Sequence, residues 1–295
     1  MMTRKTSRKL LVAVALAIAI ASARIESAPN NFLWKATKGQ GSLYLVGSVH
    51  LLTKDYYPLS PALDRAFRDS DLLVEEVDIG EMISTENQLQ MVMTGMLPAG
   101  QSLDKVVSPA TLAAVNKRLE TLGMPIEPLK RLKPWLLSLT LLTLEWQKAG
   151  FEADLGLDKH FYDLARSDAK TVQGLETVAF QISRFDGMTM EEQDRLLAET
   201  LKELDTQRTA VTALADAWKA GDVPTVERLV LQDLRSDPGV YQRMLVDRNR
   251  DWLPKLEALF ARRGRSFVVV GAAHLVGPDG LLTMLRARGY TVQQM

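Results

Sequence analysis

The sequence predicts an α/β fold, with a mixed central β-sheet, flanking helices and a large helical insertion between the N- and C-terminal halves of the sheet. Two observations carry this prediction. Short apolar runs typical of strands occur near both ends of the chain, before about residue 80 and after about residue 265. The residues between them, from about 80 to 240, form amphipathic segments with helical spacing. We therefore expect residues 24–295 to form a single domain whose sheet is shared by two distant parts of the chain.

The first 23 residues have the order of a secretory signal peptide. Four basic residues precede an apolar run over 10–21, and the small residues Ala-Ser-Ala follow at 21–23. A retained membrane anchor is the competing interpretation, but a membrane span needs roughly 20 apolar residues and this run is shorter. We expect cleavage after Ala23 and a periplasmic or secreted product without a stable membrane span.

The N-terminal half of the sheet is predicted from three strands and one helix. Residues 32–36 and 42–47 have strand character and are joined by a glycine-containing turn, which favours a hairpin. Pro58 and Pro61 indicate a helix start, because apolar residues follow them at helical spacing. Residues 72–79, LLVEEVDI, return to strand character.

The remaining elements follow in order. The helical middle is punctuated by Gly, Pro and Asp and contains one short strand, 170–173. The chain then ends with a helix over 242–262, a strand over 266–271, a helix over 280–288 and a strand over 290–293. The last two strands complete the sheet that the N-terminal residues begin.

Composition excludes several kinds of chemistry. The chain has no cysteine, so disulfides, thiolate catalysis and thiolate metal ligands are excluded. A metal ion would be held by histidine, carboxylate and water. The chain has 36 basic and 36 acidic residues, and loss of the leader leaves 32 basic residues and a net charge near −4. This balance does not indicate a nucleic-acid partner.

Two of the three histidines occupy nearly the same local sequence. Residues 44–52 read YLVGSVHLL, and residues 268–276 read VVVGAAHLV. Each is an apolar strand followed by Gly-x-x-His, and in an α/β sheet the residues just past the carboxyl ends of parallel strands face a shared crevice. We expect His50 and His274 to meet there. The alternative is two core histidines hydrogen-bonded to backbone carbonyls.

The run LLVEEVDI adds carboxylates to this region. Alternation along a strand places Glu75 and Glu76 on opposite faces. A carboxylate in apolar surroundings costs several kcal/mol unless it is paired or bound to a cation. An edge strand with solvated acids is the alternative.

The order of several motifs resembles the TraB/GumN family, which is related to the Tiki proteases. The resemblance spans about residues 31–295 and implies an EreA/ChaN/Tiki-like fold. The matching pieces are Leu-x-Leu-x-Gly-Ser-x-His at 43–50, Val-x-Glu-x-Asp at 74–78, Lys-Pro-Trp at 133–135, Gly-Leu-Asp at 156–158, Gly-Leu-Glu-Thr at 174–177, Arg-Asn-x-x-Trp at 248–252 and Val-Val-Gly-Ala-Ala-His-Leu at 269–275.

The resemblance implies a divalent metal site. Carried over by position, the ligands are His50, Glu76 and His274, and three protein ligands with an open position are typical of a catalytic centre. Glu76 also counts as a catalytic candidate together with Glu176 and Arg248, which the resemblance places in the pocket. Alternatively, Glu176 is an acid that caps a helix and Arg248 is an arginine on a helix surface. Glu75 is then structural.

Two functions follow from this interpretation. The first is an exported hydrolase that depends on Mn²⁺, Co²⁺ or Zn²⁺ and acts on a peptide or another small molecule, with peptide-bond cleavage as the favoured reaction. The alternative is a protein that sequesters a peptide or other ligand without turnover, which the pheromone-shutdown members of the family suggest. The sequence does not indicate an oligomeric state.

Overall fold

The computed structural model of the protein describes residues 31–204, 207–232 and 234–295. The predicted signal peptide, residues 1–23, lies outside these described residues. The described chain contains a six-stranded sheet in the order β4-β3-β5-β2-β1-β6. Its strands are β1 Leu33–Lys38, β2 Gly41–Ser48, β3 Leu72–Glu75, β4 Thr171–Gly174, β5 Ser266–Gly271 and β6 Thr291–Gln294.

The sheet is mixed, which confirms the predicted fold class. β4, β3, β5 and β2 run parallel to one another, whereas β1 is antiparallel to both β2 and β6. β1 and β2 form the predicted hairpin. β5 lies between β2 and β3, so a strand near the end of the chain completes a sheet begun near its start.

β3 is shorter than predicted. The sequence predicted a strand over 72–79, but the strand ends at Glu75 because the side chains of Glu75 and Asp78 turn the chain into helix α2, Ile79–Met82. The Asp78 carboxylate accepts the Gly80 N–H as a helix N-cap, and a Glu75 oxygen accepts the Ile79 N–H. Glu76 therefore lies just past the strand.

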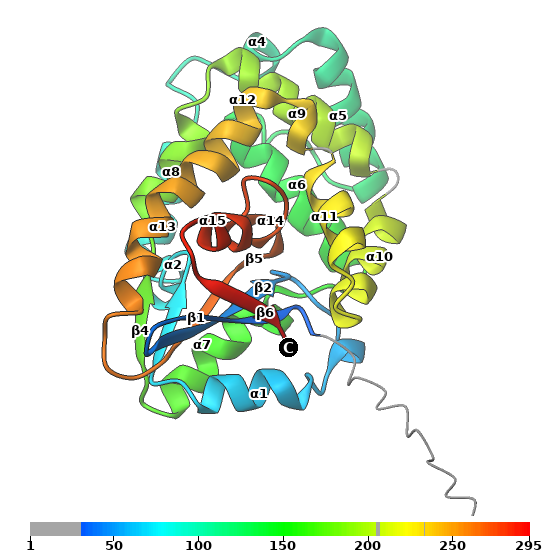
Figure 1. The fold of residues 1–295 in the computed structure, drawn as a ribbon. Helices are drawn as coiled ribbons and strands as arrows, with labels where there is room; N and C mark the ends of the chain where they lie inside the picture. Colours follow the sequence, from blue (N-terminus) through cyan, green and yellow to red (C-terminus); the bar gives the residue numbers. More distant parts are fainter. Residues whose placement is uncertain (1–30, 205–206, 233) are drawn as a thin grey trace, which may run out of the picture.

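Helices cover both faces of the sheet (Figure 1). α1 (Pro61–Arg68) and α7 (Leu157–Ser167) lie below it in this view, and α7 contacts β3, β4 and β5. α13 (Asp247–Leu259), α14 (Ala272–Leu275) and α15 (Leu281–Ala287) lie on the other face. The main hydrophobic core includes β5 residues Phe267 and Val268–Val270, which are completely buried.

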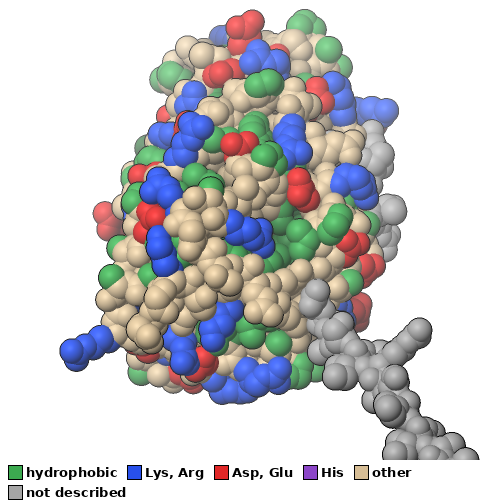
Figure 2. Space-filling view, viewed as in Figure 1, with side chains coloured by type: hydrophobic (Ala, Val, Ile, Leu, Met, Phe, Trp, Pro, Cys, Tyr) green, Lys and Arg blue, Asp and Glu red, His purple; other side chains and the backbone are tan. Residues whose placement is uncertain are grey.

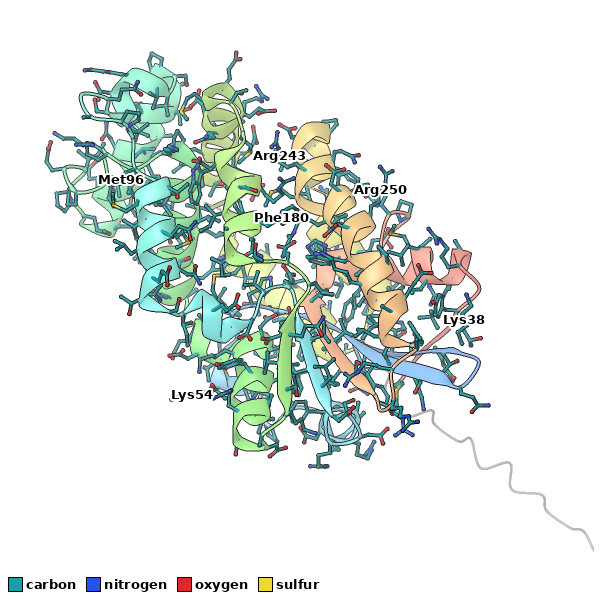
Figure 3. The ribbon with its side chains drawn as sticks, turned by 90° about the vertical axis from the view of Figure 1, so that its left-hand side faces the viewer. Lys38, Lys54, Met96, Phe180, Arg243 and Arg250 are labelled. Atoms are coloured by element: carbon teal, nitrogen blue, oxygen red, sulfur yellow. The ribbon has the colours of Figure 1, made fainter. Side chains whose placement is uncertain are left out.

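The long segment between β3 and β5 is helical apart from β4, as predicted, and most of it forms the upper part of the molecule in Figure 1. Figure 3 shows α3 at the outer edge of this part, ending near Met96. Its further helices are α3 Thr85–Thr94, α4 Leu103–Val106, α5 Pro109–Leu122, α6 Pro134–Lys148, α8 Val178–Asp186, α9 Met190–Leu204, α10 Gln207–Lys219, α11 Val223–Leu231 and α12 Pro238–Tyr241. Short 3₁₀ turns occupy η1 Lys54–Tyr56, η2 Ala153–Leu155 and η3 Leu234–Ser236.

The helix predicted over 242–262 differs from the expectation at its start. The segment η4, Gln242–Val246, is a π-helix, and α13 follows from Asp247 to Leu259. A π-turn is wider than an α-turn and often occurs at functional sites. This one ends at Val246, two residues before Arg248.

The outer surface mixes both signs of charge. Figure 2 shows lysine and arginine interspersed with aspartate and glutamate over one face. Within the described ranges, no helix is both long and apolar enough to cross a membrane.

Candidate functional site

The carboxyl ends of the four parallel strands meet at one edge of the sheet. Ser48 in β2 pairs with Gly271 in β5, and Glu75 at the end of β3 lies opposite Val269 in β5 and Gly174 in β4. Four of the five predicted site residues follow these ends within three positions: Glu176 after β4, Glu76 after β3, His274 after β5 and His50 after β2. The fifth, Arg248, lies in α13.

Each histidine is held through its Nδ1 atom. His50 Nδ1 lies 2.8 Å from the carboxylate of Asp158, in the first turn of α7. His274 Nδ1 lies 2.7 Å from Asn249 Oδ1 in α13. An acceptor at Nδ1 keeps the proton of a neutral imidazole there and leaves the lone pair on Nε2. When neutral, both rings therefore offer Nε2 as an acceptor or ligand atom.

The two rings have different environments. Burial lowers the pKa of His274 to about 3, so this ring is neutral at pH 7. The Asp158 carboxylate raises the pKa of His50 to about 9. The His50 side chain is 56% exposed, so solvent screens this attraction.

Gly271 permits the close approach of the groups around it. A Cβ atom added to Gly271 would lie 3.1 Å from Glu76 Oε1 and 3.2 Å from His50 Nε2. These distances are tighter than ordinary contacts, so a side chain at this position would push both groups aside. The glycine of the second Gly-x-x-His motif thus leaves room for the carboxylate and the imidazole on the same side of β5.

Glu76 is buried and accepts hydrogen bonds on both oxygens. Oε1 accepts the Gly271 N–H at 2.7 Å, and Oε2 accepts from Arg248 at 2.6 Å and from Gln181 at 3.4 Å. Burial alone would raise the pKa of Glu76, but the Arg248 guanidinium, with His274 and the Gly271 N–H, lowers it overall. Glu76 is therefore an ionised carboxylate at the centre of the site.

Arg248 joins the two predicted glutamates. Its Nε and Nη2 atoms donate to the two oxygens of Glu176 at 3.1 and 2.7 Å, in the bidentate arrangement that carboxylates favour. Glu176 also accepts the Trp252 indole N–H at 3.0 Å, and the guanidinium lies 4.6 Å from the centre of that ring. Arg248 is buried, which excludes the surface-arginine alternative. Burial raises the pKa of Glu176 against the lowering effect of Arg248.

Arg248 also contacts the second histidine. Its Nη1 lies 3.0 Å from His274 Nε2, while His274 Nε2 and Glu76 Oε1 are 3.9 Å apart. The guanidinium thus donates toward both an imidazole nitrogen and a carboxylate that the resemblance assigns to a metal. Among the residues with described side chains, no three His, Asp or Glu groups are arranged as a metal site.

A cavity of about 370 Å³ opens beside these groups. His50, Asp158, Glu75 and Glu76 line its polar part. Its apolar part includes Val77, Ile79, Met82, Ile83 and Ala153. Although Glu75 and Glu76 diverge at the end of the strand, both reach the cavity, because it lies past the strand ends.

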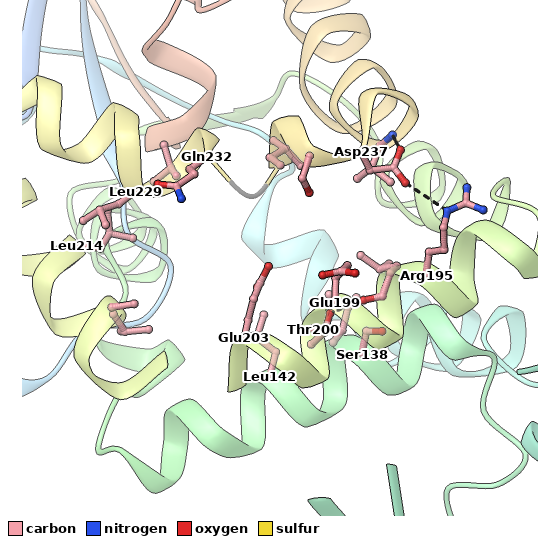
Figure 4. A pocket seen from close by; sticks show the side chains of 18 of the residues that line it. Ser138, Leu142, Arg195, Glu199, Thr200, Glu203, Leu214, Leu229, Gln232 and Asp237 are labelled. Carbon is pink, nitrogen blue, oxygen red and sulfur yellow. Dashed lines mark hydrogen bonds and ion pairs between the residues drawn. The ribbon is translucent and has the colours of Figure 1, made fainter. Parts of the chain in front are cut away.

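A larger cavity, of about 790 Å³, lies elsewhere, between α6, α9, α10 and α11 (Figure 4). None of its described lining residues is a histidine, and Arg195 on its edge pairs with Asp237 at 3.6 Å. We do not take this larger cavity as the candidate site. Functional sites are marked by titratable groups that lie close together, and these groups lie at the strand ends.

The chain matches the TraB/PrgY/gumN family over residues 32–294, almost the whole described chain. It belongs to this family. The similar "Uncharacterized protein YbaP" of Escherichia coli (strain K12) is 27% identical over 264 residues, which cover 87% of this chain and 94% of that protein. YbaP of Shigella flexneri has the same identity and coverage. An "Uncharacterized protein" of Treponema pallidum (strain Nichols) is 19% identical over 86% of this chain and 80% of its own length. No solved structure matches the chain.

Three residues of the site were not predicted as functional. Asp158, Asn249 and Trp252 orient the two histidines and Glu176. All three belong to the motifs Gly-Leu-Asp and Arg-Asn-x-x-Trp by which the chain resembles the family. Their place in these motifs was the one indication in the sequence that they belong to the site. Their polar contacts to other helices and loops cannot be predicted from a single sequence.

The burial of Glu75 predicts how the stability of the protein depends on pH. Burial raises its pKa to about 9, so between about pH 4.5 and 9 the folded state keeps a proton that the unfolded state loses. The free energy of unfolding therefore falls as pH rises through this window. Glu75→Gln, which cannot ionise, should be more stable than the wild type at pH 8, by an amount on the order of a few kcal/mol, and equal to it near pH 4.

The measurement is urea unfolding of chelator-treated protein at pH 4, 6 and 8, so that no bound ion shifts the titration. Asp154→Asn, a change at an exposed acid of the cavity lining, serves as the control and should change the free energy of unfolding by no more than about 0.5 kcal/mol. Parallel pH dependence of Glu75→Gln and the wild type would contradict the prediction.

Proposed function

We propose that this site is the active site of a hydrolase that depends on Mn²⁺, Co²⁺ or Zn²⁺ and cleaves a peptide bond. The proposed ligands are the Nε2 atoms of His50 and His274 and the carboxylate of Glu76. One observation carries the proposal: both imidazoles are fixed through Nδ1 by acceptors from α7 and α13. Metal-bound histidines make the same outer contact, which leaves Nε2 as the atom that can bind an ion.

The chemistry of the donor set fits a divalent cation. Two buried carboxylates, Glu76 and Glu176, face one buried guanidinium, so one negative charge is left for another cation. Oε1 of Glu76 accepts only the Gly271 N–H among the described hydrogen bonds and keeps a further lone pair for an ion. Binding at His274 Nε2 would require Arg248 to release that nitrogen, while its bidentate pair with Glu176 could stay intact.

The residues of the chain have separate roles in this proposal. A bound ion of this kind supplies an acidified water and polarises a carbonyl group. Glu176 and Trp252 hold Arg248 so that one edge of its guanidinium stays directed at the site. Arg248 can then donate to an oxygen that gains negative charge. Asp158 and Asn249 keep the two imidazoles in position.

A binding protein without turnover is the second candidate. One observation favours it: Arg248 already donates to Glu76 and contacts His274 Nε2, so the polar cluster is satisfied without an ion. In that case the cavity would bind a peptide or small molecule, and the cluster would only shape it.

Metal content and turnover distinguish the two candidates. We expect mature protein, purified without chelator, to contain about one divalent ion per chain by elemental analysis. It should cleave members of a peptide library in the presence of Mn²⁺, Co²⁺ or Zn²⁺, and a chelator should abolish cleavage. Absence of a stoichiometric ion, together with tight binding of uncleaved peptides, would overturn the hydrolase and favour the second candidate.

Export completes the proposal. The basic start, short apolar run and Ala-Ser-Ala of residues 1–23 support a cleaved leader. Amino-terminal sequencing of protein from the periplasm or medium should therefore begin at or near Arg24. Recovery of the intact amino terminus in a membrane fraction would instead indicate a retained anchor.

A further inference from the structure

Exposed apolar side chains are concentrated in one short segment. Five large hydrophobic residues of the described chain are exposed, and four of them lie between positions 83 and 93. These four, here called the α3 stripe, are Ile83 (50% exposed), Leu89 (59%), Val92 (46%) and Met93 (66%). Scattered exposed apolar residues need no explanation, but a cluster of this kind marks an interaction surface.

Three residues of the stripe lie on one helix, and the fourth, Ile83, ends α2 two residues before α3 begins. Leu89, Val92 and Met93 are spaced by three and four positions, so they lie on one face of α3. Met91 lies on the inner face, where it packs with the apolar cluster that includes Val178 and Ile182 of α8. The helix therefore already satisfies its packing against α8, and the stripe is a second apolar face turned outward. Figure 3 shows α3 at the edge of the molecule.

The stripe shares one residue with the cavity of the candidate site. Ile83 belongs both to the stripe and to the lining of the cavity that contains His50 and Glu76. Its neighbour Met82 also lines that cavity. Methionine side chains are flexible and adapt to different apolar partners. A ligand chain that enters the cavity past Ile83 would thus meet an apolar path along α3.

Charge narrows the choice of partner. From residue 78 to 93, around the stripe, the chain has three acidic residues, Asp78, Glu81 and Glu86, and no lysine, arginine or histidine. Interfacial helices that bind anionic lipid surfaces carry lysine and arginine on their polar face, and this helix does not. Acidic residues around an apolar stripe instead match an apolar ligand with positive charge.

We propose that the α3 stripe binds the part of the substrate that extends from the active site, and that this substrate is an extended peptide with apolar side chains and a net positive charge. This inference rests on the proposed function for the location of the reacting bond. A ten-residue helix is about 15 Å long, and an extended peptide rises about 3.3 Å per residue. The stripe therefore accommodates about four or five residues of the peptide.

The test measures binding, so that it does not depend on turnover. The probe is a fluorescein-labelled ten-residue peptide of Leu, Val, Lys and Gly, compared with a peptide in which Ser replaces Leu and Val. Its affinity for metal-supplemented wild-type protein is compared with that for the variant Leu89→Gln/Val92→Thr/Met93→Gln. Met295→Gln, which removes an exposed apolar side chain next to β6 at the far edge of the sheet, is the matched control.

We expect the triple variant to bind the apolar peptide at least about tenfold more weakly, with metal content and melting temperature unchanged. The control should bind like the wild type, and the Ser peptide should bind weakly to all three proteins. If the apolar peptide is bound in this way but not cleaved, the stripe proposal stands and the hydrolase fails. If the wild type cleaves peptides and the triple variant has the same affinity and KM, the stripe proposal fails and the hydrolase stands.

Two further results would overturn the stripe proposal by assigning the surface to another occupant. One is stripe-dependent sedimentation with phosphatidylcholine or phosphatidylglycerol vesicles combined with no peptide binding. The other is a wild-type dimer that the triple variant converts to a monomer in analytical ultracentrifugation.

Discussion

Replacing Arg248 with methionine is expected to lower the free energy of unfolding at pH 7 by about 3–5 kcal/mol. The guanidinium is 5% exposed and is bonded to Glu76 and Glu176, which are themselves 9% and 8% exposed. Methionine fills much of the same volume but leaves two carboxylates buried without a cationic partner. Removal of one member of a buried ion pair costs more than replacement of the whole pair. Urea unfolding followed by circular dichroism measures the effect.

A second variant separates loss of charge pairing from loss of packing. Arg248→Met/Glu176→Gln removes one of the two stranded charges, and its glutamine oxygen can still accept the Trp252 N–H. We expect the double variant to be more stable than Arg248→Met alone. Lower pH should also reduce the defect of the single variant, because protonation neutralises its unpaired carboxylates. A single variant within about 1 kcal/mol of the wild type would show that the cluster contributes little to folding.

The architecture was predictable from the sequence because it depends on local patterns. β5 has the predicted bounds, 266–271, since an uninterrupted run of buried β-branched residues has few other conformations. The two Gly-x-x-His segments are neighbours in the sheet because both follow parallel strands, which a pattern of strand exits can indicate. The end of β3 was not predicted, because Asp78 caps a helix through its own side chain, and its residue type alone does not distinguish a cap from a strand position.

The resemblance named residues that the structure brings together, but it did not indicate the contacts between them. The resemblance supplied His50, Glu76 and His274, together with Glu176 and Arg248. The pattern did not show that Arg248 donates to a carboxylate and contacts an imidazole of this group. Such contacts depend on the direction that α13 takes after the π-helix. The spacing of apolar residues along the sequence does not indicate this direction. The buried, protonated state of Glu75 likewise depends on neighbours that are distant in the sequence.

His50→Ala, Glu76→Gln and His274→Ala are each expected to reduce the affinity for the divalent ion by on the order of a hundredfold or more, and to abolish peptide cleavage with it. Each change removes one ligand of the same proposed ion, so pairs of these changes should cost little more than the single changes. Isothermal titration with Mn²⁺, Co²⁺ and Zn²⁺, alongside a peptide-cleavage assay, measures both quantities on the same preparations.

Substitutions at two residues beside the proposed ligands serve as controls for this prediction. Glu75→Gln changes the adjacent carboxyl group, which is already neutral at pH 7 because burial raises its pKa to about 9, so it should retain the metal affinity of the wild type. Asp158→Asn loses the negative charge beside His50 Nδ1 but can keep a hydrogen bond to it, so it should weaken metal binding by about tenfold, less than loss of His50 itself. Greater damage from Glu75→Gln than from Glu76→Gln would assign the carboxylate ligand to Glu75 in place of Glu76. Wild-type metal affinity in all three ligand variants would remove the ion from the site and leave the cavity as a pocket that binds a ligand without a metal.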